Sequence, residues 1–227
     1  MEEMVGGGAT DYLLHEVWSS SQNDVRNSTN NIIRDIKADN PDSKYYGQNI
    51  VESGAINSFP NALSRWWSAI FAKTTPINNF PDEVILDKST GLVSGGAAFT
   101  YRDHYIFRLA ETYLLRAEAY LGKGDMANAA NDINIIRARS NAEPVLPSDV
   151  DIDYILDERA RELHFETPRL LTLMRLGKLA EKVKERDPMH NGKYANHGVS
   201  EKHNRWPIPQ SEIERNTEAV LEQNPGY

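Results

Sequence analysis

The charged residues between positions 158 and 175 have the spacing that comes closest to a catalytic site. Glu158 and Glu162 are four residues apart, so on a helix they share one face, and paired carboxylates can perform acid–base catalysis. The same spacing suits structural ion pairs, because arginines stand between and beside these glutamates, and ion-pair networks also shift carboxylate pKa values. We interpret the set as an ion-pair network between adjoining helices; its members are Glu158, Arg159, Arg161, Glu162, Glu166, Arg169 and Arg175.

The segment 149–160 imitates the start of a calcium-binding EF-hand loop. Asp149, Asp151 and Asp153 alternate as calcium ligands would. Tyr154, however, stands where that loop needs glycine, and Ala160 stands where it needs a bidentate glutamate. Acidic residues in a first helical turn, where the helix dipole favours them, explain the pattern better.

Other residues that could bind a metal ion or a phosphate lack the necessary neighbours. His190, His197 and His203 share a polar segment without the short spacing of a zinc site. Neither glycine run, at 6–8 or 95–96, is followed by the lysine of a phosphate-binding loop. The chain has no cysteine, which excludes disulfides and thiolate ligands. We therefore predict no catalytic residue, no metal and no cofactor.

Two adjacent tryptophans are the residues whose chemistry best suits ligand binding. Sugar rings expose C–H groups that pack on aromatic faces, while arginine and asparagine side chains bind hydroxyl groups. Neighbouring residues of a helix point about 100° apart, so at least one tryptophan of the pair would pack inside. The candidate ligand-binding residues are Tyr45, Tyr46, Asn49, Arg65, Trp66 and Trp67.

Helices and loops, rather than a sheet, must position these residues. Apolar residues recur at spacings of three and four from Ile106 to Leu121, including Leu109, which predicts an amphipathic helix. Asp125 follows a glycine-containing turn and can cap a second helix, in which Met126 and several alanines and isoleucines share one side. Two helices joined by such a tight turn resemble one tetratricopeptide unit.

Weaker patterns predict further elements along the chain. Asp151 begins a third strong helix, and one long helix is expected after Pro168 over residues 169–186. A short helix is expected at 211–213, before a terminal turn. Shorter apolar stripes predict helices at 12–17, 28–38 and 61–72 and a strand at 84–86.

The composition is that of a globular protein with a substantial core. The 227 residues are 40% hydrophobic and 26% charged, and the net charge of −8 argues against a general nucleic-acid binder. No stretch is long and apolar enough to span a bilayer, and the amino-terminal MEEMVGGGATDY lacks the features of a secretory signal. We expect any membrane attachment to use a segment that this chain does not contain.

Three parts of the chain resemble the SusD/RagB family of outer-membrane nutrient-binding lipoproteins. Their order and spacing carry the resemblance, which covers residues 101–227 firmly and residues 10–100 loosely. The matching parts are 108–120 with 134–137, then 158–175, and finally 206–213 with 223–227. Two positions depart from the family pattern: Thr167 replaces a usual glycine, and Thr172 replaces a usual aspartate. Both departures affect packing at a helix junction.

The resemblance implies a mostly α-helical fold, a partial tetratricopeptide-like bundle with long loops. Residues 1–100 would form a loop-rich segment with short helices that contributes to ligand binding, and residues 101–227 the helical region. It also implies a place on the cell-surface side of the outer membrane, held by a lipid anchor outside this chain. The expected partners are an oligosaccharide and a SusC-like TonB-dependent transporter, with binding and delivery and no bond cleavage.

Two alternatives remain open at this stage. The family includes peptide-importing members, so a RagB-like peptide-binding role is one of them. The other is a glycosidase that uses Glu158 or Glu162 with Glu166, which would require two carboxylates across an open cleft. Burial of these carboxylates against arginines would eliminate the glycosidase.

Overall fold

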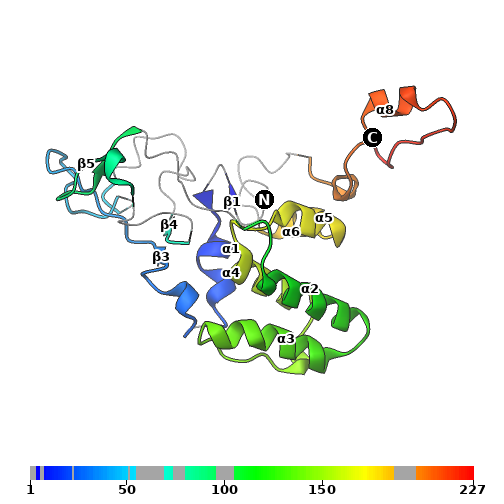
Figure 1. Ribbon diagram of the computed structural model, residues 1–227, viewed down its shortest axis with the longest axis horizontal. Coiled ribbons are helices and arrows are strands. Elements are labelled where there is room, and N and C mark those ends of the chain that lie inside the picture. Colours follow the sequence, from blue (N-terminus) through cyan, green and yellow to red (C-terminus); the bar gives the residue numbers. More distant parts are fainter. Residues whose placement is uncertain are drawn as a thin grey trace.

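The computed structural model describes residues 4–5, 8–21, 23–50, 52–54, 69–73, 80–95, 105–186 and 198–227. The chain is mostly helical, as expected. Figure 1 shows the helical part in the middle, with the hairpin of β5 (Ile85–Asp87) and β6 (Leu92–Val93) at one end of the long axis. The short helix α8 (Gln210–Arg215) lies at the other end. Both the strand expected at 84–86 and the helix expected at 211–213 are confirmed to within a few residues.

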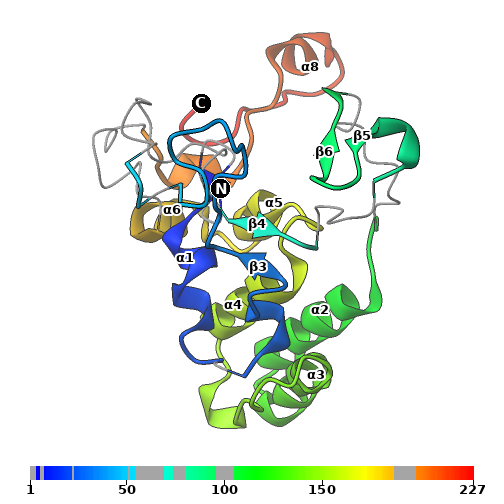
Figure 2. The same ribbon diagram turned by 90° about the vertical axis from the view of Figure 1, so that its left-hand side faces the viewer.

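Helices α2 (Leu109–Gly122) and α3 (Met126–Arg139) form the predicted helical hairpin and lie side by side in Figures 1 and 2. The carboxylate of Asp125 caps α3 by accepting a hydrogen bond from the Asn128 backbone N–H at 3.1 Å. Gly124 has a φ of +76°, which glycine adopts without the strain that a side chain would bring. The predicted cap and turn are both confirmed.

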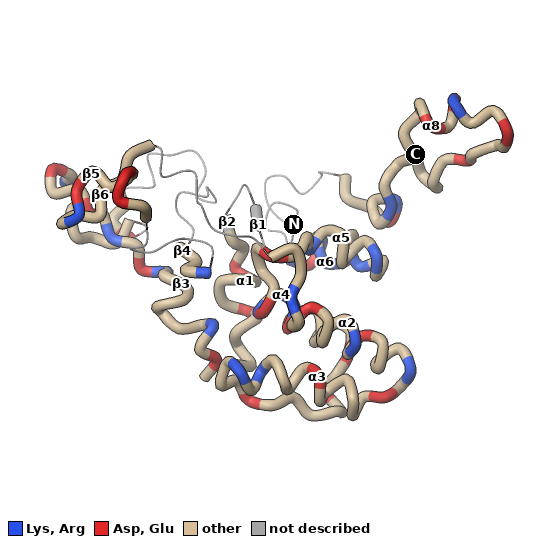
Figure 3. The backbone as a smooth tube through the Cα atoms, in the orientation of Figure 1, with Lys and Arg blue, Asp and Glu red and all other residues tan. Residues whose placement is uncertain are grey.

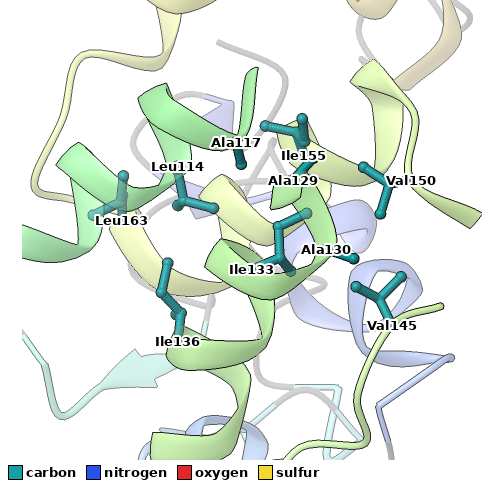
Figure 4. Close-up of a cluster of buried hydrophobic side chains, with 10 residues drawn as sticks. All are labelled: Leu114, Ala117, Ala129, Ala130, Ile133, Ile136, Val145, Val150, Ile155 and Leu163. Carbon is teal, nitrogen blue, oxygen red and sulfur yellow. The ribbon is translucent and has the colours of Figure 1, made fainter. Parts of the chain in front are cut away.

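The hairpin buries one face of each helix against α4 (Ile152–Leu163). Figure 4 shows Leu114 of α2, Ile133 of α3 and Ile155 of α4 within the same cluster of buried side chains. The prediction for the start of α2 was wrong. Ile106 is 86% exposed and Leu109 is 66% exposed, because the helix begins only at Leu109 and the residues before it are not helical.

Two more apolar side chains of this hairpin are exposed. Met126, expected on the buried side of α3, is more than one-third exposed at the first position of that helix. Leu115 lies off the apolar stripe of α2 and is also exposed. Figure 3 shows acidic and basic residues interspersed along the same two helices.

Helix α4 is the central element, because it contributes to three separate hydrophobic clusters. Ile155 packs with α2 and α3, Ala160 with the amino-terminal segment, and Leu156 with the helices that follow. Asp151 caps α4 by accepting a hydrogen bond from the Tyr154 backbone N–H at 2.7 Å, as its position predicts. Since α4 has neighbours on several sides, its charged residues are buried too and need partners.

The amino-terminal segment packs on α4 through α1 (Asp11–Leu14) and the 3₁₀ turn at Glu16–Trp18, close to the helix expected at 12–17. The helix predicted over 28–38 is wrong. Instead, β3 (Ile32–Ile33) pairs antiparallel with β4 (Ile70–Phe71). β-branched isoleucines favour a strand once a partner strand is available, and only the tertiary fold supplies one. The same pairing shows that the end of the helix expected at 61–72 is wrong, because Ile70 and Phe71 form a strand. Residues 61–68 lie outside the described residues.

The helix predicted over 169–186 is two helices, α5 (Arg169–Arg175) and α6 (Leu179–Arg186). The break contains Gly177 at a φ of +66°, a left-handed conformation that ends a helix. A third two-stranded sheet, the hairpin of β1 (Met4–Val5) with β2 (Gly8–Ala9), lies at the amino terminus. No helix within the described ranges is long and apolar enough to cross a membrane.

The carboxy-terminal residues fold back on the segment that precedes α8. Gln223 exchanges two hydrogen bonds of 2.8 Å with the backbone of Ile208, and the Asn224 amide donates to the carbonyl of Trp206. The Tyr227 hydroxyl donates to the carbonyl of Arg205. Residues 206–213 and 223–227, which together make up the third part that resembles the family, therefore form one structural unit.

Candidate functional site

Glu158 lies at the centre of a buried charge network on α4. Its carboxylate accepts hydrogen bonds from Arg137 Nη1 at 2.8 Å and from Arg161 Nε at 2.9 Å, and Arg26 Nη2 lies 2.9 Å from its other oxygen. Burial alone would raise the pKa of Glu158, but the three guanidinium groups outweigh it, so the pKa is lowered. Glu158 is therefore a buried, ionised partner of arginines from three parts of the chain.

Glu162, one turn later on α4, shares Arg26 with Glu158 and pairs with two more guanidinium groups. Its carboxylate accepts from Arg26 Nη1 at 2.7 Å and from Arg108 Nη1 at 2.6 Å, and it also accepts from Arg139. Arg108 donates in addition to the Glu162 backbone carbonyl. The buried carboxylate thus connects the amino-terminal segment with the residues before α2 and at the end of α3.

Glu166 follows α4 and extends the network toward the surface. Lys73 Nζ lies 2.6 Å from one of its oxygens, and Arg108 donates to the other. Burial raises the pKa of Glu166, but the hydrogen bonds from Arg108 and Lys73 outweigh it and lower the pKa. The predicted network is confirmed, although three of its partners, Arg26, Lys73 and Arg139, come from positions that the sequence pattern did not single out.

The other members of the predicted charge set face different neighbours. Arg169 donates to the Leu156 carbonyl at 2.7 Å, and Arg175 forms an ion pair with Glu118 of α2. These contacts join α5 to α4 and α2. They complete a network between adjoining helices, which is the interpretation that the sequence favoured.

This arrangement eliminates the glycosidase alternative. Glu158 and Glu162 are buried and lie on one helix face, not on opposite sides of an open cleft. A glycosidase also needs a general acid that keeps its proton, which requires a raised pKa. The pKa values of Glu158 and Glu166 are both lowered.

A cavity of about 260 Å³ opens beside this network. His164 lies in its wall, and burial, with a smaller contribution from Lys73, lowers the pKa of this histidine to about 3, so the ring is neutral near pH 7. Tyr105, which is 69% exposed, forms another part of the wall. The full lining consists of Arg26, Lys73, Tyr105, Arg108, Arg139, Arg161, Glu162, His164 and Glu166.

Three of the predicted ligand-binding residues lie in the described loop at 38–50. The Asn49 amide donates to Asp35 at 2.8 Å and accepts from the Glu52 backbone N–H at 3.0 Å, so it helps to close the loop. Tyr45 is half-buried with Lys44 Nζ 4.7 Å from its ring centroid. Tyr46 is 59% exposed and presents an aromatic ring to solvent. The other three candidates, Arg65, Trp66 and Trp67, lie outside the described residues.

Sequence patterns missed most of the cavity residues. Arg26, Lys73 and Tyr105 come from three separate segments, and nothing in their local spacing indicates that they meet. The predicted charge set supplies Arg161, Glu162 and Glu166, and Arg108 begins the first segment that resembles the SusD/RagB family. Of the three histidines considered as zinc ligands, His203 bonds to Ser200 in a 3₁₀ turn. His190 and His197 lie outside the described residues.

Comparison with known proteins places the helical region in a family. Residues 85–227 match the SusD family over more than half of the chain. The chain belongs to the SusD family. It is 33% identical over 160 residues to the starch-binding protein SusD of Bacteroides thetaiotaomicron, an alignment that covers 68% of this chain and 28% of that protein. No solved structure matches the chain.

Membership agrees with the interpretation of the charge network. SusD family proteins are non-enzymatic binding proteins, so carboxylates that serve as ion-pair partners are expected in one. The departure at Thr172 has a visible consequence. Arg159 reaches the Thr172 hydroxyl at 3.4 Å and Glu111 at 3.2 Å, and its buried Nη1 has no hydrogen-bond partner among the described residues. A hydroxyl here replaces the carboxylate that would pair with this arginine.

Proposed function

We propose that this chain is part of a glycan-binding protein that delivers an oligosaccharide to a SusC-like TonB-dependent transporter. The observation that carries the proposal is the similarity to a starch-binding protein within the SusD family. The aligned part covers only 28% of that relative, so the glycan role of the whole protein is an inference from this similarity. By the same inference, the protein acts on the cell-surface side of the outer membrane.

The loop-rich residues 1–100 are the proposed ligand-binding part, and the helical residues 101–227 the scaffold. Tyr46 supports this division, because an exposed aromatic ring in a loop stabilised by Asn49 suits packing against a sugar ring. The ion-paired α4 supports the scaffold role, because its buried side chains are held from several directions. We propose Tyr45, Tyr46, Asn49, Arg65, Trp66 and Trp67 as the residues that contact glycan.

Affinity electrophoresis tests the proposal directly. The chain is run through gels that contain soluble neutral polysaccharides, beside the variants Tyr46→Ala, Trp66→Ala and Trp67→Ala. We expect retardation by at least one polysaccharide, and its loss in at least one variant. Trp206→Ala is the matched control, because Trp206 is an exposed tryptophan in the segment before α8 and not in the proposed loop site, so its retardation should not change.

Two other outcomes would count against the proposal. Retardation that persists in all three loop variants contradicts the proposed site. Absence of retardation by every polysaccharide, together with binding to a library of short peptides, would favour the RagB-like peptide-binding alternative.

A further inference from the structure

The cavity beside α4 carries an excess of positive charge. Five cationic side chains line it, against two carboxylates. Asp24 and Glu158 pair with lining arginines from behind, and Arg137 pairs with Glu158, so the surrounding groups together count six cations against four carboxylates. This local excess stands out in a chain whose net charge is −8. A cavity with this balance attracts an anion.

One of the lining cations has an unused hydrogen-bond donor. Arg161 is 1% exposed, donates from Nε to Glu158, and donates from Nη1 to the Val17 carbonyl at 2.6 Å. Its buried Nη2 has no hydrogen-bond partner in the described part of the chain, although the Tyr154 ring lies 5.4 Å from the guanidinium carbon. A buried guanidinium N–H without an acceptor is costly, so an acceptor oxygen in the cavity would stabilise it.

Two further cations can receive the same anion. Arg139 is at the end of α3 and is exposed, and one of its terminal nitrogens donates to Glu162. A guanidinium offers five N–H donors, so donors remain for a second oxyanion. Burial lowers the pKa of Lys73 even though Glu166 pairs with it, and an added anion would favour its charged form.

The uncharged part of the lining indicates which kind of molecule would bear the anionic group. Tyr105 places a mostly exposed aromatic ring beside the charged residues, which is the arrangement that packs against the C–H face of a sugar. At about 260 Å³ the cavity is smaller than the usual site for a drug-sized ligand, so it fits one sugar unit or its charged group, not a chain of several.

We propose that this cavity binds the oxyanion of one acidic sugar unit, a carboxylate or a sulfate ester, with its ring against Tyr105. The oxyanion would accept hydrogen bonds from Arg161, Arg139 and Lys73. The inference rests on the proposed glycan-binding function and adds a ligand class, glycans with acidic substituents. It also adds a second contact point, separate from the aromatic loop residues.

The test is a calorimetric titration of the chain with galacturonate, galactose 6-sulfate, galactose, acetate and inorganic sulfate. We expect at least one acidic sugar to bind about tenfold more tightly than galactose and than either free anion, and its affinity to fall as salt is added. Equal affinity for the free anions and the acidic sugars would overturn the sugar contact. No binding of any acidic sugar would overturn the proposal as a whole.

Matched variants separate this site from its surroundings. Arg139→Gln and Tyr105→Ala should each weaken acidic-sugar binding about tenfold, since both side chains are exposed and Glu162 keeps its ion pairs with Arg26 and Arg108. Arg116→Gln is the control, because Arg116 is an exposed arginine of α2 paired with Asp132 and does not line the cavity. Equal weakening of acidic-sugar binding in this control would show that the effect comes from general surface charge, and it would contradict the proposal.

The electrophoresis with neutral polysaccharides keeps the two proposals distinguishable. Retardation by a neutral polysaccharide with no titration signal from acidic sugars supports the glycan function and rejects the cavity. Binding of acidic sugars without any neutral retardation supports the cavity and rejects the loop residues as the platform.

Discussion

His164 shows how strongly a single buried residue can depend on its surroundings. Its ring forms a cluster with Phe71 and Phe165, at centroid distances of 5.4 and 5.3 Å, and Nδ1 donates to the carbonyls of Ala160 and Arg161. Burial and the nearby Lys73 lower its pKa to about 3, so the folded protein holds a neutral histidine over most of the acidic range.

This histidine predicts a pH dependence of stability. Its folded-state pKa lies below the ordinary value of 6.5, so below that pH the unfolded chain takes up a proton that the folded chain does not. The free energy of unfolding should therefore fall as the pH drops from 6.5 toward 3, by about 1.4 kcal/mol for each unit. Urea denaturation at several pH values from about 7.5 to about 5 measures the slope.

The variant His164→Gln should flatten that slope over the same range, because glutamine does not titrate. The exposed His15 provides the control, since His15→Gln should leave the slope as it is. An unchanged slope in His164→Gln would show that other groups produce the pH dependence.

Individual residues of α4 were predictable, but their partners were not. The alternation of glutamate and arginine from Glu158 to Glu162 indicates ion pairing from spacing alone. Arg26 lies far away in sequence and pairs with both glutamates only in the folded chain, and Lys73 pairs in the same way with Glu166. Local periodicity carries no information about such contacts, which is why the cavity could not be predicted.

At the scale of elements, the break between α5 and α6 depends on one glycine. Gly177→Ala should lower the free energy of unfolding by about 1 to 2 kcal/mol, because alanine is strained at a φ of +66°. A Cβ atom here would meet nothing within 4 Å, so the strain would come from the backbone alone. Thermal or urea denaturation measures the difference.

Gly122 is the matched control for this substitution. It also has open space around an added Cβ, but it is the last residue of α2 and its φ is not positive. Gly122→Ala should be neutral or stabilise by up to about 1 kcal/mol. Equal destabilisation by both substitutions would contradict the role of the left-handed conformation at Gly177.

Elements were predictable where local signals agree. The hairpin of α2 and α3 combines helical periodicity, a glycine turn and the Asp125 cap, and all three indicate the same structure. Residues 28–38 have an apolar stripe, but pairing of β3 with β4 decides their conformation. That pairing depends on residues nearly forty positions away, so the local stripe was misleading.

At the scale of the whole molecule, Glu158 connects the amino-terminal segment to the helical region. Glu158→Gln keeps the size but leaves three arginines around a neutral group, which should cost about 3 to 5 kcal/mol. Hydrogen exchange should show a similar loss of protection in residues 11–18 and in α3, since Arg26 and Arg137 lose the same partner.

Glu118→Gln provides a comparison on the surface, because Glu118 pairs with the half-exposed Arg175. Its cost should stay below about 1 kcal/mol. Loss of protection in α3 alone after Glu158→Gln would show that the amino-terminal segment is held independently of this carboxylate.

The partnership of Arg26 with Glu162 also sets an order of events during synthesis. The two residues are 136 positions apart, so the ribosome needs on the order of ten seconds between adding the first and adding the second. Throughout that interval the amino-terminal segment has no α4 to pack against, and its apolar residues Leu13, Val17 and Trp18 stay without their native cover. The nascent chain is therefore open to chaperones until α4 has left the exit tunnel.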